Sequence, residues 1–356
     1  MNIKSKPKTY LWIWILWVML FYAVWLATVI YQDQWQTIQE HWPIALSMAL
    51  GSYAAGSTPM GGGTVGFPVL VMLFDMPAMM GRDFSFAVQS IGMTSASILI
   101  LVRRQPLAWA MLEGALLGAL IGTPLGIFLV APYVPELWIK LLFAVIWASF
   151  GILHLFRLDE ISGHTGMTDL GERWDFKVGF MIALFSTLCV ASVTGVGIDM
   201  VLYSALVLLC RADLKIAIPS SVVIMAFTSI IGVMVNWLGG GFQPGVYENW
   251  LAAAPIVILG APAGVLIVNW IGRKPTLLFV AVLCVGQYLW TCFAEFDELA
   301  WGGVVLASIG VLVFLAGFEL LRSWGGRLVG ERQWRASQQR MGNSLPANVQ
   351  LAVTDR

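Results

Sequence analysis

Long apolar runs separated by short polar links make up most of this chain. The first run, Tyr10–Ile30, would be about 32 Å long as a helix, which is enough to cross a lipid bilayer. Seven further runs of similar length predict seven more spans. They are Asp83–Val102, Leu107–Ala131, Leu137–Phe156, Leu214–Leu238, Trp250–Ile271, Thr276–Phe293 and Ala300–Leu321. The pattern therefore predicts an all-α integral membrane protein with about eight transmembrane helices.

Two apolar stretches, Pro43–Phe74 and Phe180–Cys210, do not follow this simple pattern. Each consists of two short apolar pieces around a Gly-rich polar break, where glycine and proline cannot sustain a regular helix. Non-helical backbone at membrane depth is tolerated only where protein buries it or where it lines a cavity. These stretches are therefore predicted to be broken helices inside the bundle.

The distribution of basic residues favours a re-entrant threading of both stretches. If each stretch crossed the membrane once, with a cytoplasmic N-terminus, five basic residues would lie outside: Arg103, Arg104, Arg157, Arg173 and Lys177. If each stretch enters and returns to the same side, Arg82 and Lys140 are the basic residues outside, among 20 in the chain. The positive-inside rule prefers the second arrangement, with both termini in the cytoplasm.

Composition narrows the class of protein further. Of 356 residues, 59% are hydrophobic and 11% are charged, whereas about a quarter are charged in soluble domains. This excludes a water-soluble globule and, apart from the ends, a disordered chain. The four cysteines fall in apolar runs, so we expect buried thiols, and neither they nor the three histidines show metal-ligand spacing. No metal, cofactor or nucleic-acid partner is expected, and no catalytic residue is apparent.

The chain also contains an approximate copy of itself. The break Ser57–Gly63 recurs as Ser192–Gly197, Asp83–Ser90 recurs as Asp213–Ser220, and Gly122–Gly126 recurs as Gly260–Gly264. Each unit holds one hairpin and three spans, and an odd number of spans inverts the second unit. Inverted repeats with interrupted helices are typical of secondary transporters, whose sites lie at the repeat interface. The predicted segments are 1–42 with the first span, repeat 43–157, linker 158–176, repeat 177–293, last span 294–321 and a flexible cytoplasmic tail 322–356.

The two breaks are the predicted binding site for a small anion. A helix that starts after each break would present backbone N–H groups and a partial positive charge. Glycine allows an anion to approach the backbone, and hydroxyls and an amide add hydrogen-bonding groups; the same residues would otherwise serve as turns, caps and helix-to-helix contacts. The candidate substrate-binding residues are Thr58, Gly61, Gly62, Gly63, Thr64, Gln89, Ser90, Ser192, Thr194, Gly195, Gly197 and Ser220.

Other residues invite two interpretations each. Asp199 is either a helix cap or a protonatable group that couples anion movement to protons. Arg82, beside Asp83, is either an external gate or part of an ion pair at a helix start. The glycines at 114, 118, 122 and 126 form an i+4 ladder that suits close helix packing, within the bundle or between the subunits of a homodimer.

These motifs resemble the sulfite exporter TauE/SafE family of bacterial membrane anion permeases. The resemblance covers roughly Pro43 to Phe293 and rests on three segments. They are Gly61-Gly62-Gly63-Thr64-Val65-Gly66-Phe67-Pro68, Arg82-Asp83-Phe84-Ser85 with Gln89-Ser90-Ile91-Gly92-Met93-Thr94, and Thr194-Gly195-Val196-Gly197-Ile198-Asp199-Met200. The chain departs from many members at Ile198-Asp199, where part of a second glycine-rich run is replaced.

The resemblance implies a bacterial inner-membrane transporter that exports sulfite or an organosulfonate. The residues themselves indicate only a small anion, moved by alternating access, with Asp199 as a candidate for coupling to protons. Import or channel-like flow of another small anion, and a non-transporting membrane scaffold, are alternative functions. An enzyme is not expected, since no nucleophile–base pair is visible in the sequence.

Overall fold

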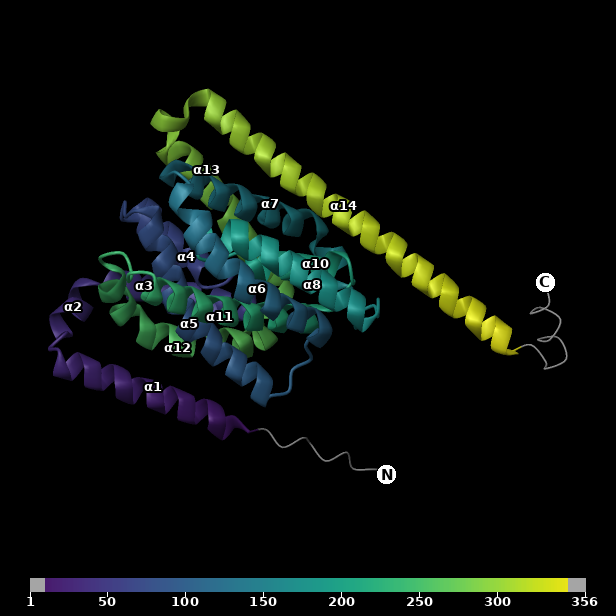
Figure 1. Cartoon of the computed structure of the whole chain (residues 1–356), viewed down its shortest axis with the longest axis horizontal. Helices are drawn as coiled ribbons and strands as arrows, with labels where there is room; N and C mark the ends of the chain where they lie inside the picture. The colour runs from purple at the N-terminus through teal and green to yellow at the C-terminus, as the bar shows by residue number, and fades with distance from the viewer. Residues whose placement is uncertain (1–9, 345–356) are drawn as a thin grey trace.

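The computed structural model describes residues 10–344, and side chains within 10–332 except Asn269. These residues form helices and connecting loops (Figure 1), and nine of the helical segments are long and apolar enough to cross a membrane. The helices are α1 (Leu11–Tyr31), α2 (Trp35–Glu40), α3 (Trp42–Ser57), α4 (Gly63–Pro68), α5 (Ala78–Val102), α6 (Trp109–Leu129), α7 (Glu136–Ser162), α8 (Glu172–Ser186), α9 (Ser192–Thr194), α10 (Ile198–Leu208), α11 (Leu214–Leu238), α12 (Val246–Ile271), α13 (Arg273–Ala294) and α14 (Phe296–Ser344).

The all-helical class is confirmed, and each of the eight predicted spans lies largely within one of these helices. The ninth such helix begins earlier than the sequence predicted for the stretch Phe180–Cys210. The first half of this stretch belongs to a continuous helical segment, Glu172–Thr194, in which α8 passes through the π-helical turn Thr187–Ala191 into α9. The helix starts earlier than predicted because the charged residues of its first turns are compatible with a helix, although they resemble a polar link in the sequence.

At both breaks the chain reverses direction. Along the first, a Cβ on Gly62 would meet Ala55, and one on Gly66 would meet Met48, so α4 runs back along α3. After the second, α10 returns to the loop that precedes α8, where the N–H of Thr168 donates to the carbonyl of Cys210 at 2.9 Å. Both stretches are therefore antiparallel hairpins within the fold, while their re-entrance into a bilayer stays a prediction.

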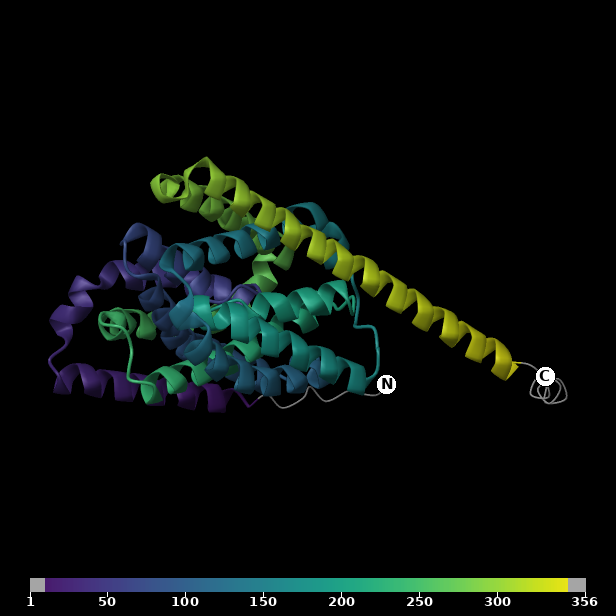
Figure 2. The ribbon, with the colours of Figure 1, turned by 45° about the horizontal axis from the view of Figure 1, so that its top comes forward.

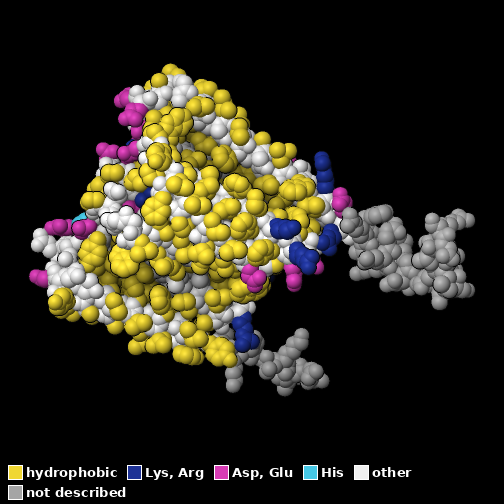
Figure 3. All heavy atoms as spheres, in the orientation of Figure 1, with side chains coloured by type: hydrophobic (Ala, Val, Ile, Leu, Met, Phe, Trp, Pro, Cys, Tyr) yellow, Lys and Arg dark blue, Asp and Glu magenta, His cyan; other side chains and the backbone are white. Residues whose placement is uncertain are grey.

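The two ends of the bundle carry opposite charge (Figure 3). The basic end joins α7, α13 and α14 through the ion pairs Lys274–Asp159 at 2.9 Å and Arg322–Glu160 at 3.1 Å. At the acidic end, Lys140 pairs with Glu295 at 2.7 Å and is only slightly exposed. The charge asymmetry that the sequence suggested is thus built into the fold.

Helices α5 and α11 run in opposite directions. The start of α5 lies at the end of α11, where Arg82 donates to Asn236 at 3.5 Å, and the loop after α5 lies near the start of α11, where the N–H of Ala108 donates to Ser220 at 3.0 Å. This arrangement is the one expected of an inverted repeat, although the repeat itself stays a prediction.

Helices α1 and α14 flank opposite sides of the bundle in both views (Figures 1 and 2). Their outer faces are strongly exposed and apolar, as at Trp12 (62%) and Leu312 (64%), which suits contact with lipid. Helix α14 also corrects a prediction: it continues to Ser344, so residues 322–344 are helical rather than a flexible tail. The residues beyond Leu321 include many helix formers and extend a helix that already exists; 345–356 lie outside the described residues.

The glycine ladder of α6 packs inside the bundle, as one of its two interpretations predicted. A Cβ on Gly114 would collide with the carbonyl oxygen of Phe176, and one on Gly118 with that of Phe180. Both members of the pair move four residues toward the C-terminus from the first contact to the second. Helices α6 and α8 therefore run parallel, with their backbones in close contact. The ladder is therefore occupied within the subunit and is not available as a dimer interface.

Cysteine labelling tests the re-entrant threading. In a background without the native cysteines, Arg103→Cys and Arg173→Cys are expected to react with a membrane-impermeant thiol reagent from the cytoplasmic side alone. Glu136→Cys, at the acidic end, should react from the outside and serves as the control. Labelling of both arginine positions from outside would contradict the threading. The native cysteines must be removed because Cys189 is exposed, contrary to the expectation that all four thiols are buried.

Candidate functional site

The two breaks contact each other in the centre of the bundle, across the start of α5. A Cβ on Gly63, in the first break, would meet both Val196 of the second break and Ser85 of α5 at less than 3.0 Å. The Gln89 amide nitrogen donates to the carbonyl oxygens of Ser85 at 2.9 Å and Gly195 at 3.1 Å. The predicted meeting of two glycine-rich breaks is thus present in the fold, with α5 between them.

Gly61 lies between two oxygen atoms that have no partner. Its φ of +60° is in the left-handed region that favours glycine. A Cβ at this position would meet Oε1 of Gln89 and Oδ2 of Asp199 at less than 3.0 Å. Both side chains are almost completely buried, and neither oxygen has a hydrogen-bond partner among the residues that the structure describes. The centre of the site therefore contains two acceptors that face the same point.

The other carboxylate oxygen of Asp199 caps its own helix. Oδ1 accepts from the backbone N–H of Gly197 at 3.2 Å and of Met200 at 3.0 Å. The first N–H groups of α4 also have acceptors within the protein, here backbone carbonyls: Thr64 donates to Gly61 and Val65 donates to Gly62. These N–H groups, among those the sequence predicted to face an anion, have internal partners in this conformation.

Most of the hydroxyls that were predicted to bind the substrate donate to nearby backbone carbonyls instead. Thr58 donates to Ala54 at 2.7 Å, Ser192 to Leu188 at 2.7 Å, and Thr194 bridges the carbonyls of Val190 and Val196. These contacts are those of helix caps and turns, which was the alternative interpretation of these residues.

Thr64 differs from the other hydroxyls because its partners come from two elements. It donates to the carbonyl of Met60, while the indole N–H of Trp147 on α7 donates to it at 2.9 Å. Trp147 is not among the site residues that the sequence indicated. Its position near the middle of a span was the signal that could have found it.

Ser90 and Ser220 lie apart from the contact between the breaks, whereas the backbone of Arg82 lies against Gly195 and its side chain binds elsewhere. Ser90 donates to the carbonyl of Ala87 at 2.8 Å and lines a separate apolar pocket, and Ser220 accepts from the N–H of Ala108. Arg82 is almost fully buried, and its guanidinium binds Asp83 at 2.6 Å, so it forms the ion pair that was one of its two interpretations. Asp83 also accepts from the amide of Asn236 and the N–H of Gln243, which fixes the loop after α11.

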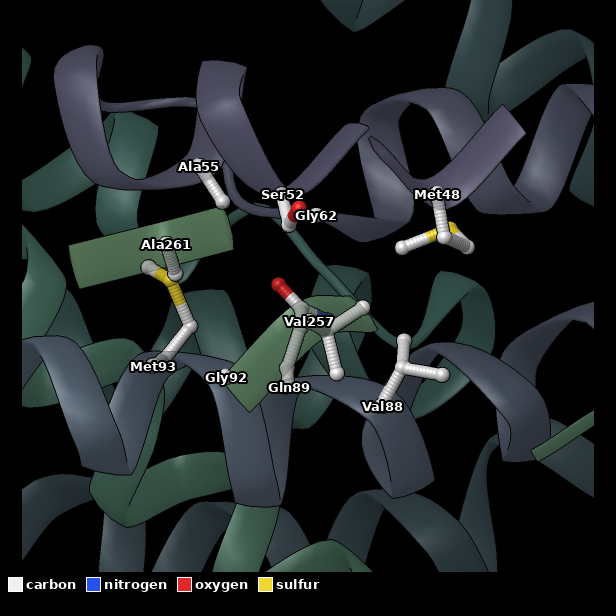
Figure 4. A pocket seen from close by; sticks show the side chains of 10 residues that line it. All are labelled: Met48, Ser52, Ala55, Gly62, Val88, Gln89, Gly92, Met93, Val257 and Ala261. Carbon is white, nitrogen blue, oxygen red and sulfur yellow. The ribbon is translucent and has the colours of Figure 1, made fainter. Parts of the chain in front are cut away.

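The cavity lined by Gly62 and Gln89 is small: its volume of about 10 Å³ is roughly the room that one water molecule needs. A second, mostly apolar cavity of about 470 Å³ is lined by Thr64 and Val65, at the start of α4. In Figure 4 the Gln89 side chain rises from α5 toward Gly62 and Ser52, while Met48 and Met93 lie to either side. The breaks are therefore closed around this point. Among the residues that the structure describes, no three His, Cys, Asp or Glu side chains gather as metal ligands.

Within residues 10–344, nine helices of membrane-spanning length enclose two helical breaks that meet at mid-bundle, which defines a multi-pass membrane protein of the transporter type. The family model for the sulfite exporter TauE/SafE family matches residues 44–289, and the chain belongs to that family. The match covers both hairpins and the helices that position the breaks. Comparisons with curated proteins and with solved structures gave no match.

Proposed function

We propose that the protein is a secondary transporter of the bacterial inner membrane that exports a small sulfur-containing oxyanion. Sulfite is the first candidate and an organosulfonate the second, because the family is named for sulfite export. The observation that carries the proposal is the contact between two glycine-rich breaks, Gly61–Gly63 and Gly195–Gly197, at the centre of a membrane-spanning bundle.

Access to the site requires that the breaks separate. The cavity lined by Gly62 and Gln89 is too small for an oxyanion, so in this proposal the conformation described corresponds to the occluded state of an alternating-access cycle. When the breaks part toward one end of the bundle, hydroxyls such as Thr64 and backbone N–H groups now bound internally can exchange their partners for the oxygens of the substrate. Export follows if the site loads from the basic end and empties at the acidic end.

Asp199 is the proposed coupling residue. Its carboxyl group is fully buried, and among the described residues no cationic side chain pairs with it. A buried carboxylate at the site would repel an anion, whereas its protonated form would not. Proton binding at Asp199 and anion binding at the breaks are therefore linked in this proposal.

Sulfite efflux from proteoliposomes tests the proposal. Efflux is expected to depend on the protein, to respond to a pH gradient and to fall at least tenfold in the double variant Gly62→Leu with Thr194→Val. The leucine fills the small cavity beside Gln89, and the valine removes the hydroxyl that shapes the second break. Absence of sulfite flux in folded native protein would overturn the sulfite assignment, and a panel of sulfonates and carboxylates would then decide the substrate.

A further inference from the structure

The two unpaired oxygens beside Gly61 come from opposite halves of the chain. Gln89 belongs to α5, which follows the first hairpin, and Asp199 belongs to α10 in the second hairpin. Each oxygen lies within 3.0 Å of the position of a Cβ on Gly61, so the two lie no farther apart than twice that distance. Both are buried acceptors without a donor, and a buried unpaired acceptor is costly.

The orientation of the Gln89 amide is fixed by its partners. Its nitrogen donates to two carbonyl oxygens, those of Ser85 and Gly195, and a carbonyl oxygen cannot donate in return. Turning the amide over would place oxygen against oxygen at both contacts. Oε1 must therefore face Gly61 and Asp199, and the missing group at this point is a donor.

We propose that Asp199 and Gln89 hold one proton between them when the two breaks are closed. The proton binds to Oδ2 of Asp199, which becomes a neutral carboxylic acid, and its O–H donates to Oε1 of Gln89. Loss of the proton leaves a carboxylate that faces an amide oxygen in an apolar setting, which favours separation of the two breaks. This inference rests on the proposed function for its role in transport, and it names Gln89 as a proton partner rather than a ligand of the substrate.

The surroundings favour a proton over a metal cation. A sodium ion needs several oxygen ligands and room of its own, whereas the point beside Gly61 has two facing oxygens and a closed cavity. The other titratable or charged groups come from the elements packed around the breaks. They are the Arg82–Asp83 pair on α5, His154 on α7 bonded to Tyr203 on α10 at 3.0 Å, and Cys284 on α13, which contacts Met60. Among the described residues, no hydrogen bond or ion pair links any of these groups to the Asp199 side chain, so the proton on Asp199 has Gln89 as its acceptor.

Infrared titration of the full-length protein in nanodiscs, without substrate, tests the proposal. Native protein is expected to show the C=O band of a protonated carboxylic acid that disappears as the pH is raised, and Asp199→Asn should lack this band. Gln89→Glu places a second carboxyl at the site, and like charges at close range raise proton affinity. It is therefore expected to raise the midpoint of the titration by about one pH unit, a tenfold increase in proton affinity.

Control variants and an exchange of cations show which interpretation each result of the titration supports. Asp175→Asn makes the same change in another buried aspartate, at the basic end, and should keep the band. If Gln89→Glu does not fold, Gln89→Met replaces it and should move the band to higher frequency, because the acid loses its acceptor. A band that persists in Asp199→Asn, or an unmoved midpoint and band in the Gln89 variants, would overturn the shared proton. So would a midpoint that shifts when sodium replaces choline. Loss of sulfite flux with an intact titration would instead reject the proposed substrate alone.

Discussion

Replacing Gly61 with alanine is expected to abolish anion flux and to destabilise the closed bundle. The backbone at Gly61 is left-handed, which costs an L-residue about 1–2 kcal/mol. The new methyl group would also collide with Oε1 of Gln89 and Oδ2 of Asp199, so the two breaks could not close around this point. We expect flux at least a hundredfold below native in proteoliposomes, together with a lower melting temperature in detergent.

The neighbouring glycine provides a matched control. Gly62 has an ordinary helical φ of −69°, and a Cβ there would meet Met48, Ala55 and Gln89 at normal van der Waals distances. Gly62→Ala is therefore expected to keep the melting temperature close to native. Equal destabilisation by both alanines would show that the breaks are merely sensitive to added volume, and would contradict the specific role given to Gly61.

The largest effect on coupling is expected from Asp199→Asn. Asparagine retains an oxygen that can accept from the N–H groups of Gly197 and Met200, so the cap of α10 survives. Its amide nitrogen can donate to Oε1 of Gln89, which imitates the protonated acid. Since removal of a charge from the bundle centre relieves a cost of about 2.5–3.5 kcal/mol, the variant should fold at least as well as the native protein at high pH.

We expect Asp199→Asn to transport anions at a rate that no longer depends on pH. The measurement is flux from proteoliposomes over a range of symmetric pH values and then with an imposed gradient. Asp175→Asn, which changes an aspartate remote from the breaks, should keep the native pH response. An unchanged pH response in Asp199→Asn would rule out Asp199 as the coupling group.

The spans and the breaks were predictable because membrane insertion leaves few alternatives. A run of about 20 apolar residues has to form a helix, and glycine with proline interrupts one visibly. The errors fall where polar residues continue a helix. Glu172 and its neighbours resemble a loop by composition, and the residues after Leu321 show no apolar period, yet both segments extend helices that the bundle already holds.

The candidate site was predictable as a set of residues but not as an arrangement. The sequence indicated Gly61, Gln89 and Asp199 separately. It could not show that the two side chains face the same glycine, because that contact depends on how α5 and α10 pack. The capping of α10 by Asp199 was also not predictable. An aspartate near a helix start suits the helix dipole whether it caps the helix or binds a proton, and only the contacts of Oδ1 show which N–H groups it accepts from.

The close backbone contacts of the fold determine which parts can move together. Besides α6 against α8, Gly56 and Gly264 bring α3 against α12, where a Cβ on Gly56 would collide with the carbonyl of Ala261. Each contact joins the entering limb of one hairpin to a span from the other half of the chain. The two halves are thus interlocked and cannot separate as rigid lobes. In the proposed transport cycle, we therefore expect the crossed pairs α3–α12 and α6–α8 to move as units, with the breaks as hinges.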